Sequence, residues 1–262
     1  MHRFLRGVAI VALINAGACG RASMIPSTTA PAPSTTAPQP TPAANRQLPN
    51  DIAWFRFSAE YRALTRQAYR VASERLPELS RGLPARSWAV IFDVDETILD
   101  NSEYEQRRFL LDSAYTEPSW NVWVNERAAT AVPGAPEFIR RVKELGGRVA
   151  IVTNRTESQC AVTRDNLRTI GVEPDLLLCQ APGQSDKNPR FRRIQDGSAV
   201  AGVPALTVVA WVGDNILDFP GMSQEVRWSN PAALADFGVR YFILPNPMYG
   251  SWPHSEPIHS RP

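Results

Sequence analysis

The chain has 262 residues, which suits one large domain or a core with a modest insertion. Hydrophobic residues make up 44% of it, enough for a buried core, so the chain as a whole is not a disordered protein. The formal net charge is only +2, and no basic stripe interleaved with aromatic residues is visible, which argues against a nucleic-acid polymer as the partner.

The N-terminus has the layout of a secretory signal. Two arginines within residues 1–6 precede the apolar run GVAIVALI at 7–14, which is too short to span a bilayer as a helix. The small residues AGA at 16–18, directly before Cys19, fit an ordinary cleavage site and also resemble a bacterial lipobox, whose cysteine becomes lipidated. We predict a signal peptide over residues 1–18 and an extracytoplasmic protein. It is either a lipoprotein anchored to a bacterial membrane through Cys19 or a secreted or periplasmic protein.

The segment that follows, residues 19–49, is rich in proline, serine, threonine and alanine. Such a composition buries too little apolar area to offset its ordering entropy, so we predict an extended tether. A tether directly after Cys19 would hold a domain away from a membrane, and this favours the lipoprotein over simple secretion. The folded domain is expected over residues 50–262.

The rest of the chain alternates helical patterns with short apolar runs. Apolar residues recur at three- and four-residue steps over residues 51–79, which predicts a helix that Pro77 ends or kinks. Strands are predicted at 88–93, 148–153, 175–179, 207–213 and 240–244. Helices are predicted at 137–145, 157–170 and 188–195. Strands that are apolar throughout and alternate with helices indicate a parallel sheet covered on both faces, a doubly wound α/β fold.

Residues 101–132 have a different character from the rest. They are polar and aromatic, with no clean strand alternation, and we interpret them as an insertion or cap. The helix predicted over residues 51–79 is expected to pack with this insertion.

Two of the three cysteines belong to the predicted sheet region. Cys160 lies near the start of the helix after the second strand, and Cys179 lies at the end of the third strand, so both belong to one edge of the sheet. A disulfide between them is geometrically feasible and would require an oxidising compartment. Two buried free thiols are the alternative, and the two readings carry equal weight.

Acidic and polar residues follow the predicted strands at the edge where parallel sheets bind ligands. Such a set suits a metal ion and a phosphate group. The residues are Asp93 and Asp95, then Thr153, Asn154 and Arg155, then Lys187, and finally Asp214, Asn215 and Asp218.

These residue types suit phosphoryl transfer from a phosphate monoester. A carboxylate nucleophile repels the phosphate dianion, and a bound Mg²⁺ together with a lysine cancels that repulsion. Asp93, Asp214 and a backbone carbonyl near Asp95 are the candidate oxygen ligands of Mg²⁺. The other oxygen of Asp93 is the candidate nucleophile. Asp95, which two residues further along projects to the same side, is the candidate general acid and then base.

The remaining candidates surround the phosphate and its counter-charges. Thr153 and the backbone N–H of Asn154 are expected to hold the phosphoryl oxygens, and Lys187 is expected to offset their negative charge. Asp218 would hold Lys187 or a metal-bound water, with Asn215 in support.

Four of these stretches resemble a known set of motifs. DVDET at 93–97, TNR at 153–155, the lysine at 187 and GDNxxD at 213–218 match, in this order, the motifs of the haloacid dehalogenase (HAD) superfamily. Longer segments resemble the class C acid phosphatases, bacterial lipoprotein phosphatases of the HAD acid-phosphatase group (subfamily IIIB) that are related to outer-membrane lipoprotein 5′-nucleotidases. These segments are SAEYRALTRQAY (58–69), DVDETILDNSEY (93–104), SWNVWV (119–124), PGAPEF (133–138), KNPRF (187–191), VGDNILDF (212–219) and LPNPMYGSW (244–252). The resemblance covers roughly residues 50–253.

The resemblance implies a HAD-like Rossmannoid core with a small, mostly helical cap over residues 101–132. It also implies an Mg²⁺-dependent acid phosphatase that forms an aspartyl-phosphate on Asp93. In these relatives, aromatic residues of the cap and the C-terminal loop sandwich a nucleobase. Trp120 and Tyr249 match those residues by position, with Tyr104 nearby, which implies nucleoside 5′-monophosphates among the substrates. Packing within the cap or loop is the alternative for these side chains.

Other functions remain open on the same scaffold. A phosphotransferase, a sugar phosphatase and a non-catalytic binding or storage protein are the alternatives, and the presence of Asp93 argues against the last of them. A homodimer also remains open. The loop APGQSD before Lys187 is poorer in lysine than the resemblance implies, so weaker positive charge is expected around the phosphate.

Overall fold

The computed structural model describes residues 46–253. The signal peptide predicted over residues 1–18, Cys19 and most of the tether lie outside the described residues. Within the described part of the chain, no helix combines the length and the apolar character needed to cross a membrane.

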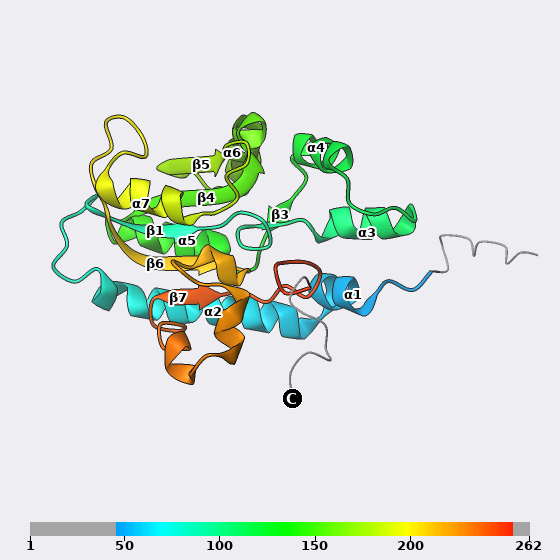
Figure 1. The fold of residues 1–262 in the computed structure, drawn as a ribbon, viewed down its shortest axis with the longest axis horizontal. Coiled ribbons are helices and arrows are strands. Elements are labelled where there is room, and N and C mark those ends of the chain that lie inside the picture. The colour runs from blue at the N-terminus through cyan, green and yellow to red at the C-terminus, as the bar shows by residue number, and fades with distance from the viewer. Residues whose placement is uncertain (1–45, 254–262) are drawn as a thin grey trace, which may run out of the picture. The chain divides into compact units, whose positions relative to one another are not determined.

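A five-stranded parallel sheet forms the centre of the domain (Figure 1). The strand order is β5-β4-β1-β6-β7, and every neighbouring pair runs parallel. The strands are β1 (Trp88–Phe92), β4 (Arg148–Thr156), β5 (Leu176–Gln180), β6 (Thr207–Gly213) and β7 (Tyr241–Ile243). The predicted parallel sheet is confirmed, although β4 continues beyond its predicted end at residue 153.

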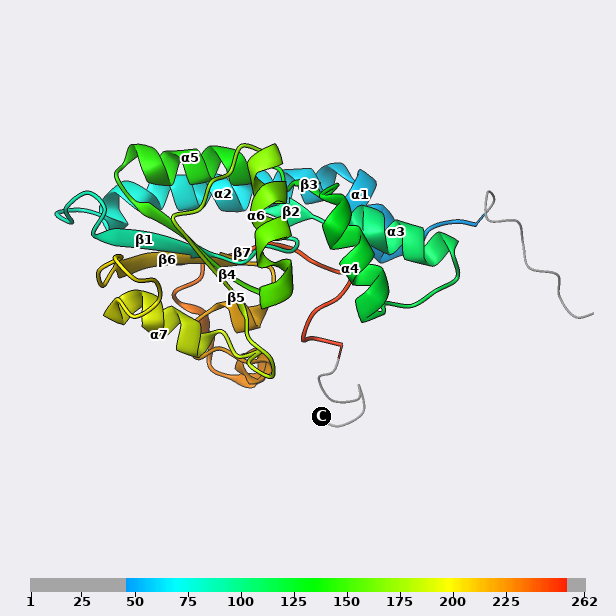
Figure 2. The ribbon, with the colours of Figure 1, turned by 90° about the horizontal axis from the view of Figure 1, so that it is seen from above.

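Helices cover both faces of this sheet (Figure 2). α2, α5 and α6 lie over one face, and α7 lies under the other. Outside residues 99–131, the α-helices of the described chain are α1 (Asn50–Phe57), α2 (Ala59–Leu79), α5 (Ala135–Glu144), α6 (Cys160–Thr169) and α7 (Asn188–Asp196). This is the doubly wound α/β arrangement that the alternating pattern predicts.

The chain reverses its direction across the sheet beside β1. It passes from β1 through α5 to β4 and through α6 to β5, and it then returns through α7 to β6 on the other side of β1. Right-handed crossovers in opposite directions place their helices on opposite faces. The loops therefore diverge at the carboxyl end of β1, where open α/β sheets bind ligands.

Side chains of β1 fill both interfaces. Val90 and Phe92 belong to the hydrophobic cluster under α2 and α5, and Ala89 and Ile91 belong to the cluster on the α7 face. All five residues of the strand are buried. A strand covered on both sides needs a continuous apolar run rather than an alternating one, and WAVIF is such a run.

The prediction of one continuous helix over residues 51–79 is wrong, because the structure has two helices there. The backbone of Ser58 is extended, and its side-chain oxygen accepts a hydrogen bond from the Tyr61 N–H at 3.0 Å. Ser58 is therefore the N-cap of α2, and the chain breaks there into α1 and α2. Pro77 lies inside α2, which continues to Leu79.

Residues 99–131 leave the sheet and form what we call the cap segment. It consists of β2 (Leu99–Asp100), α3 (Ser102–Leu110), α4 (Glu117–Glu126) and β3 (Thr130–Ala131). β2 and β3 pair antiparallel at its base, and the sequence pattern misses this ribbon because two-residue strands show no alternation. α1 packs against α3, and Arg56 Nη1 donates to Ser102 Oγ at 3.1 Å.

A disulfide joins Cys160 at the start of α6 to Cys179 in β5. The two Cα atoms are 6.0 Å apart, and the cysteines are separated by 19 residues in the sequence. Of the two alternatives, the structure therefore contains the disulfide. It connects α6 to β5 near the carboxyl edge of the sheet.

Replacing both cysteines with serine is expected to lower the free energy of unfolding by roughly 3 kcal/mol, because the bridge restricts the unfolded chain over a loop of this length. Denaturant unfolding of the oxidised wild type and of the C160S/C179S variant measures the difference. The reduced wild type is the control and should unfold at the midpoint of the variant. Equal midpoints for the oxidised wild type and the variant would contradict the stabilising role.

Candidate active site

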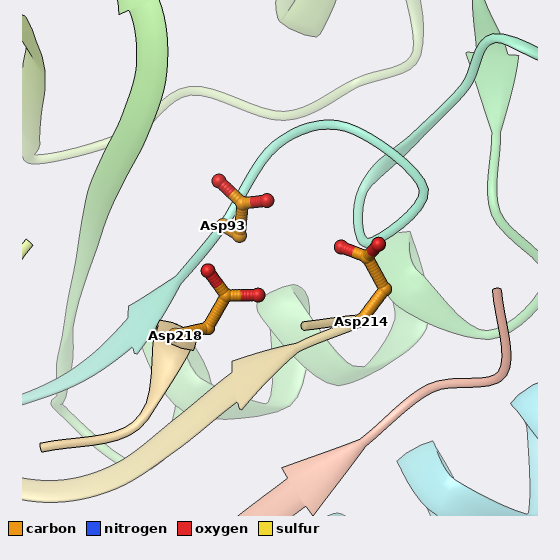
Figure 3. Close-up of side chains that lie close together, drawn as sticks. All are labelled: Asp93, Asp214 and Asp218. Carbon is orange, nitrogen blue, oxygen red and sulfur yellow. The ribbon is translucent and has the colours of Figure 1, made fainter. Parts of the chain in front are cut away.

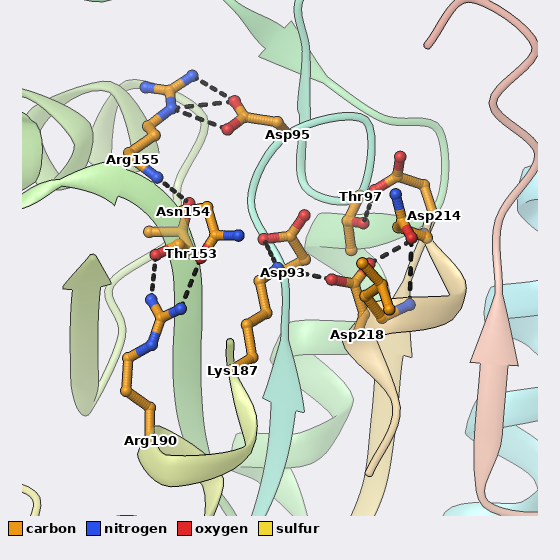
Figure 4. Close-up of polar contacts among 12 residues, drawn as sticks. Asp93, Asp95, Thr97, Thr153, Asn154, Arg155, Lys187, Arg190, Asp214 and Asp218 are labelled. Carbon is orange, nitrogen blue, oxygen red and sulfur yellow. Dashed lines mark hydrogen bonds and ion pairs between the residues drawn. The ribbon is translucent and has the colours of Figure 1, made fainter. Parts of the chain in front are cut away.

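The carboxyl ends of β1, β4 and β6 and the loop before α7 bring the predicted acidic and phosphate-binding residues together (Figure 4). Asp93 directly follows β1, Asp214 directly follows β6, and Lys187 is the N-cap of α7. The Asp93 N–H donates to the Val212 carbonyl at 3.0 Å, which ties two of the strand ends together. A cavity of about 590 Å³ lies at this edge. Its lining includes Asp93, Asp95, Asn154, Lys187, Asp214, Asn215, Asp218 and Tyr249.

Lys187 bridges two of the carboxylates. Its Nζ lies 2.6 Å from Asp93 Oδ1 and 2.6 Å from Asp218 Oδ1, and its side chain is 6% exposed. Burial disfavours the charged ammonium group, but the carboxylates of Asp218 and Asp93 outweigh this and hold the pKa of Lys187 above its usual value. Lys187 is therefore a fixed positive charge beside Asp93.

Three carboxylates lie close together at this point (Figure 3). Oxygen atoms of Asp93, Asp214 and Asp218 lie within 4.8 Å of one another. The pKa of Asp93 is raised to about 7. Burial raises it most, Lys187 lowers it, and the carboxylates of Asp218 and Asp95 raise it. Burial, followed by Asp218 and Asp93, also raises the pKa of Asp214. One ammonium group therefore faces three carboxylates, and it does not balance their charge when all three are ionised.

The arrangement fits a hard divalent cation. All three groups offer carboxylate oxygens, which Mg²⁺ and similar ions prefer, and a dication would offset the uncompensated charge. The carboxylates of Asp93 and Asp214, two of the predicted ligands, belong to this cluster, and Asp218 is its third member. The third predicted ligand is a backbone carbonyl at Asp95 and stays a prediction.

Two side chains that the sequence analysis missed hold Asp214 in place. Thr97 Oγ1 donates to Asp214 Oδ1 at 3.1 Å, and Asn246 Nδ2 donates to Asp214 Oδ2 at 2.9 Å. The Tyr69 hydroxyl in turn donates to the Thr97 carbonyl at 2.6 Å. Both residues could have been found from the matched motifs. Thr97 belongs to DVDET, and Asn246 belongs to LPNPMYGSW.

A close approach of backbone to side chain positions Asp218. The Asn215 N–H donates to Asp218 Oδ2 at 2.9 Å, and Asn215 Oδ1 accepts a hydrogen bond from Ser251 Oγ at 2.7 Å. A Cβ atom at Gly213 would lie 2.3 Å from the side chain of Asp218. Only glycine at this position leaves room for the carboxylate that pairs with Lys187.

Gly213→Ala is expected to destabilise the fold by about 1–3 kcal/mol, because a methyl group is forced into a packed site and must displace Asp218. Thermal unfolding measures the effect. Thr207→Ala, at the exposed opposite end of β6, is the matched control and should unfold close to the wild type. A Gly213→Ala variant as stable as that control would show that Asp218 moves aside at no cost.

Asp95 lines the same cavity as Asp93, but its carboxylate faces Arg155 (Figure 4). Arg155 Nη2 lies 2.7 Å from Asp95 Oδ1, and Asn101 Nδ2 donates to the same oxygen at 2.9 Å. The two-residue alternation expected from Asp93 to Asp95 does not apply, because β1 ends at Phe92 and the chain turns. The sequence pattern places Arg155 at this edge but does not indicate its partner.

Arg190 supports Thr153 and Asn154 in β4. Its Nη1 donates to the Thr153 carbonyl at 2.5 Å, and its Nη2 donates to Asn154 Oδ1 at 2.5 Å. The side chain is buried and comes from α7, three residues after Lys187. The lysine-poor loop APGQSD predicts weak positive charge around the phosphate. The Arg190 guanidinium group adds a positive charge beside Thr153 and Asn154 that this prediction did not include. Arg190 belongs to the KNPRF segment, which was the available signal.

The three predicted aromatic residues occupy different positions. Trp120 on α4 lines a second cavity of about 690 Å³, and Asn154 lines both cavities. Tyr249 lines the first cavity. Tyr104 is 3% exposed, its hydroxyl shares a hydrogen bond of 2.8 Å with Ser119 Oγ, and its ring centroid lies 5.2 Å from that of Trp120. Tyr104 lines neither of these two cavities and instead packs behind Trp120.

The fold and the site define a class of protein. A doubly wound parallel sheet with DVDET after its central strand, a lysine beside the first aspartate and GDNxxD after β6 is the arrangement of a HAD-like phosphatase. The chain belongs to the HAD superfamily, subfamily IIIB (acid phosphatase), whose family model matches residues 8–252.

The chain is similar to a solved structure of this kind. The class C acid phosphatase from Bacillus anthracis, solved with tungstate bound, is 29% identical in sequence. The match has a TM-score of 0.67 and covers 77% of this chain and 84% of that one.

Curated plant proteins are similar as well. Acid phosphatase 1 of Solanum lycopersicum is 28% identical over 161 residues, which are 61% of this chain and 57% of that protein. A stem 31 kDa glycoprotein of Glycine max is 24% identical over 201 residues, or 74% of this chain and 68% of that protein. The match thus spans somewhat more than half of the tomato protein.

Proposed function

We propose that this chain is an Mg²⁺-dependent phosphomonoesterase that hydrolyses phosphate monoesters, including nucleoside 5′-monophosphates. The reaction passes through an aspartyl-phosphate on Asp93. The observation that carries the proposal is the contact of Lys187 with Asp93 within a cluster of three carboxylates. Membership of the acid phosphatase family and the similarity to a tungstate-binding relative support it, because tungstate, like phosphate, is an oxyanion.

Phosphate binding relies on groups at the ends of β1, β4 and α7. Lys187 neutralises part of the charge of the incoming dianion, and Thr153 with the N–H of Asn154 holds its oxygens. Arg190 keeps both of these residues in place through the Thr153 carbonyl and the Asn154 side chain. Mg²⁺, held by Asp93, Asp214 and the Asp95 carbonyl, would offset the repulsion between carboxylate and phosphate.

The chemistry then takes two steps. An oxygen of Asp93 attacks phosphorus, the bond from phosphorus to the leaving oxygen breaks, and Asp95 gives that oxygen a proton. In the second step Asp95 takes a proton from a water molecule that attacks phosphorus. The Asp93–phosphorus bond breaks, inorganic phosphate leaves, and both carboxyl groups return to their first state.

The leaving group is proposed to lie between the two cavities. Trp120 lines one cavity, Tyr249 lines the other, and Asn154 is common to both. The proposed leaving group is a nucleoside whose base stacks on these side chains, because flat rings stack on aromatic side chains. Tyr104 contributes indirectly by packing against Trp120.

The proposed location is outside the cytoplasm, with attachment to a bacterial membrane through a lipidated Cys19. The Cys160–Cys179 disulfide supports it, because such bonds persist in oxidising compartments. Intact mass of the mature protein purified from membranes tests the attachment. A mass that includes a lipid on Cys19 is expected. A mature polypeptide without lipid that begins at another residue would contradict the attachment and favour secretion.

A phosphate-release panel tests the proposed activity. The purified protein is assayed with nucleoside 5′-monophosphates, sugar phosphates and p-nitrophenyl phosphate, each with Mg²⁺. Trp120→Ala is expected to raise the KM for nucleotides about tenfold, as loss of base stacking does. Val122→Ala, at an exposed position of the same helix, should not change it. No release from any ester would overturn the proposal, and a preference for sugar phosphates would favour the sugar phosphatase instead.

A further inference from the structure

Arg155 is a buried cation whose side-chain nitrogens all have partners. It is 2% exposed, although it lies at the edge of the sheet that carries the active site. Nη1 donates to Thr163 Oγ1 at 3.2 Å on α6, and Nη2 donates to Asn101 Oδ1 at 3.2 Å. Nε and Nη2 both donate to Asp95. A side chain fixed from several directions has little freedom left, so it can hold its partner in one orientation.

The hydrogen bonds to the Asp95 carboxylate fall mainly on one of its two oxygens. Arg155 Nε and Nη2 lie 2.9 and 2.7 Å from Oδ1, and Asn101 Nδ2 adds a third donor at 2.9 Å. The other oxygen, Oδ2, has a longer contact of 3.3 Å with Nε. A guanidinium facing a carboxylate often binds both oxygens with two parallel hydrogen bonds. Here Oδ1 accepts three hydrogen bonds, and Oδ2 is the less engaged of the two oxygens.

The same arginine contacts Trp120, which the proposed function places beside the leaving group. The Arg155 guanidinium carbon lies 5.3 Å from the ring centroid of Trp120, a cation–π distance. Asn101, its second partner, also accepts a hydrogen bond from Trp123 Nε1 at 2.9 Å. Both tryptophans belong to α4 of the cap segment. Arg155 therefore connects the Asp95 carboxylate to α4, whose Trp120 lines the second cavity.

We propose that Arg155 is a positioning residue for proton transfer to the leaving group. It saturates Oδ1 of Asp95, so that Oδ2 delivers the proton to the leaving oxygen beside Trp120. This inference rests on the proposed function. Arg155 itself neither gains nor loses a proton and does not touch the phosphorus.

Two phosphate esters of similar shape separate this role from a general loss of structure. The nitrophenolate of p-nitrophenyl phosphate leaves without a proton, whereas the alkoxide of p-nitrobenzyl phosphate needs one. Arg155→Met is expected to lower kcat/KM for the benzyl ester about 100-fold, the usual contribution of a positioned general acid, and to change the phenyl ester less than about threefold. The ratio of the two kcat/KM values is the readout, because it is insensitive to the amount of folded enzyme.

Two further variants keep the test decisive if Arg155→Met folds poorly. Thr163→Val removes only the oxygen that holds Arg155 Nη1, and it should shift the ratio in the same direction by a smaller factor. Arg164→Met, on the same helix but paired with Glu173, is the matched control and should leave the ratio unchanged. Equal losses for both esters in Arg155→Met and Thr163→Val, or no loss in either, would overturn the positioning role. A wild type without activity on either ester would instead overturn the proposed function.

Discussion

Asp93→Asn is expected to lower phosphate release from every substrate by at least about 10³-fold, because losing a nucleophile removes the whole covalent route. The amide has the shape of the carboxylate but does not attack phosphorus. The fold should survive, since Lys187 keeps its contact of 2.6 Å with Asp218. Acid-quenched mass spectrometry during turnover adds a direct readout. A phosphate adduct is expected in the wild type and not in the variant.

The matched control for this variant is Asp165→Asn. Asp165 is a half-buried aspartate on α6 that pairs with Arg127 and Arg168, and it does not line the cavity. Its replacement should leave phosphate release within about twofold of the wild type, as for most surface substitutions. If Asp93→Asn and Asp165→Asn were equally active, Asp93 would not be the nucleophile. The proposed aspartyl-phosphate on Asp93 would then be rejected as well.

Removal of divalent metal is expected to abolish activity and to lower stability in a pH-dependent way. In the metal-free protein the pKa of Asp93 is about 7, above the value of an unfolded chain, with burial as the main cause. Between about pH 4 and pH 7 the folded state therefore binds more protons at this group than the unfolded state. Its contribution to stability is present at low pH and is lost as pH rises toward 7.

Metal reverses that trend, because it binds the deprotonated carboxylates and competes with protons. The rise in melting temperature on replacing EDTA with MgCl₂ should be large at pH 8 and should shrink toward pH 5. Differential scanning fluorimetry across this range measures it. Asp93→Asn is expected to lose most of the rise. A metal-induced shift that grows as pH falls, or activity that is unaffected by chelator, would contradict the metal site.

The strands were predictable because each is an apolar run with a clear end. β1 is buried at all five positions and β6 at every position after Thr207, so burial is visible in successive residues rather than in every second one. The break between α1 and α2 was not predictable from periodicity. Apolar spacing continues across Ser58, and only the capping hydrogen bond to Tyr61 shows where the helix restarts.

The sequence by itself determined the sheet and the edge at which Asp93, Lys187 and Asp214 meet, because the carboxyl ends of parallel strands share one edge. The tertiary structure decided which groups pair there. Asp95 pairs with Arg155 across 60 positions of sequence, and Asn246 reaches Asp214 across 32. Such contacts depend on how each loop turns after its strand. Neither periodicity nor composition carries that information, since hydrogen-bond partners far apart in sequence meet only once the core has packed.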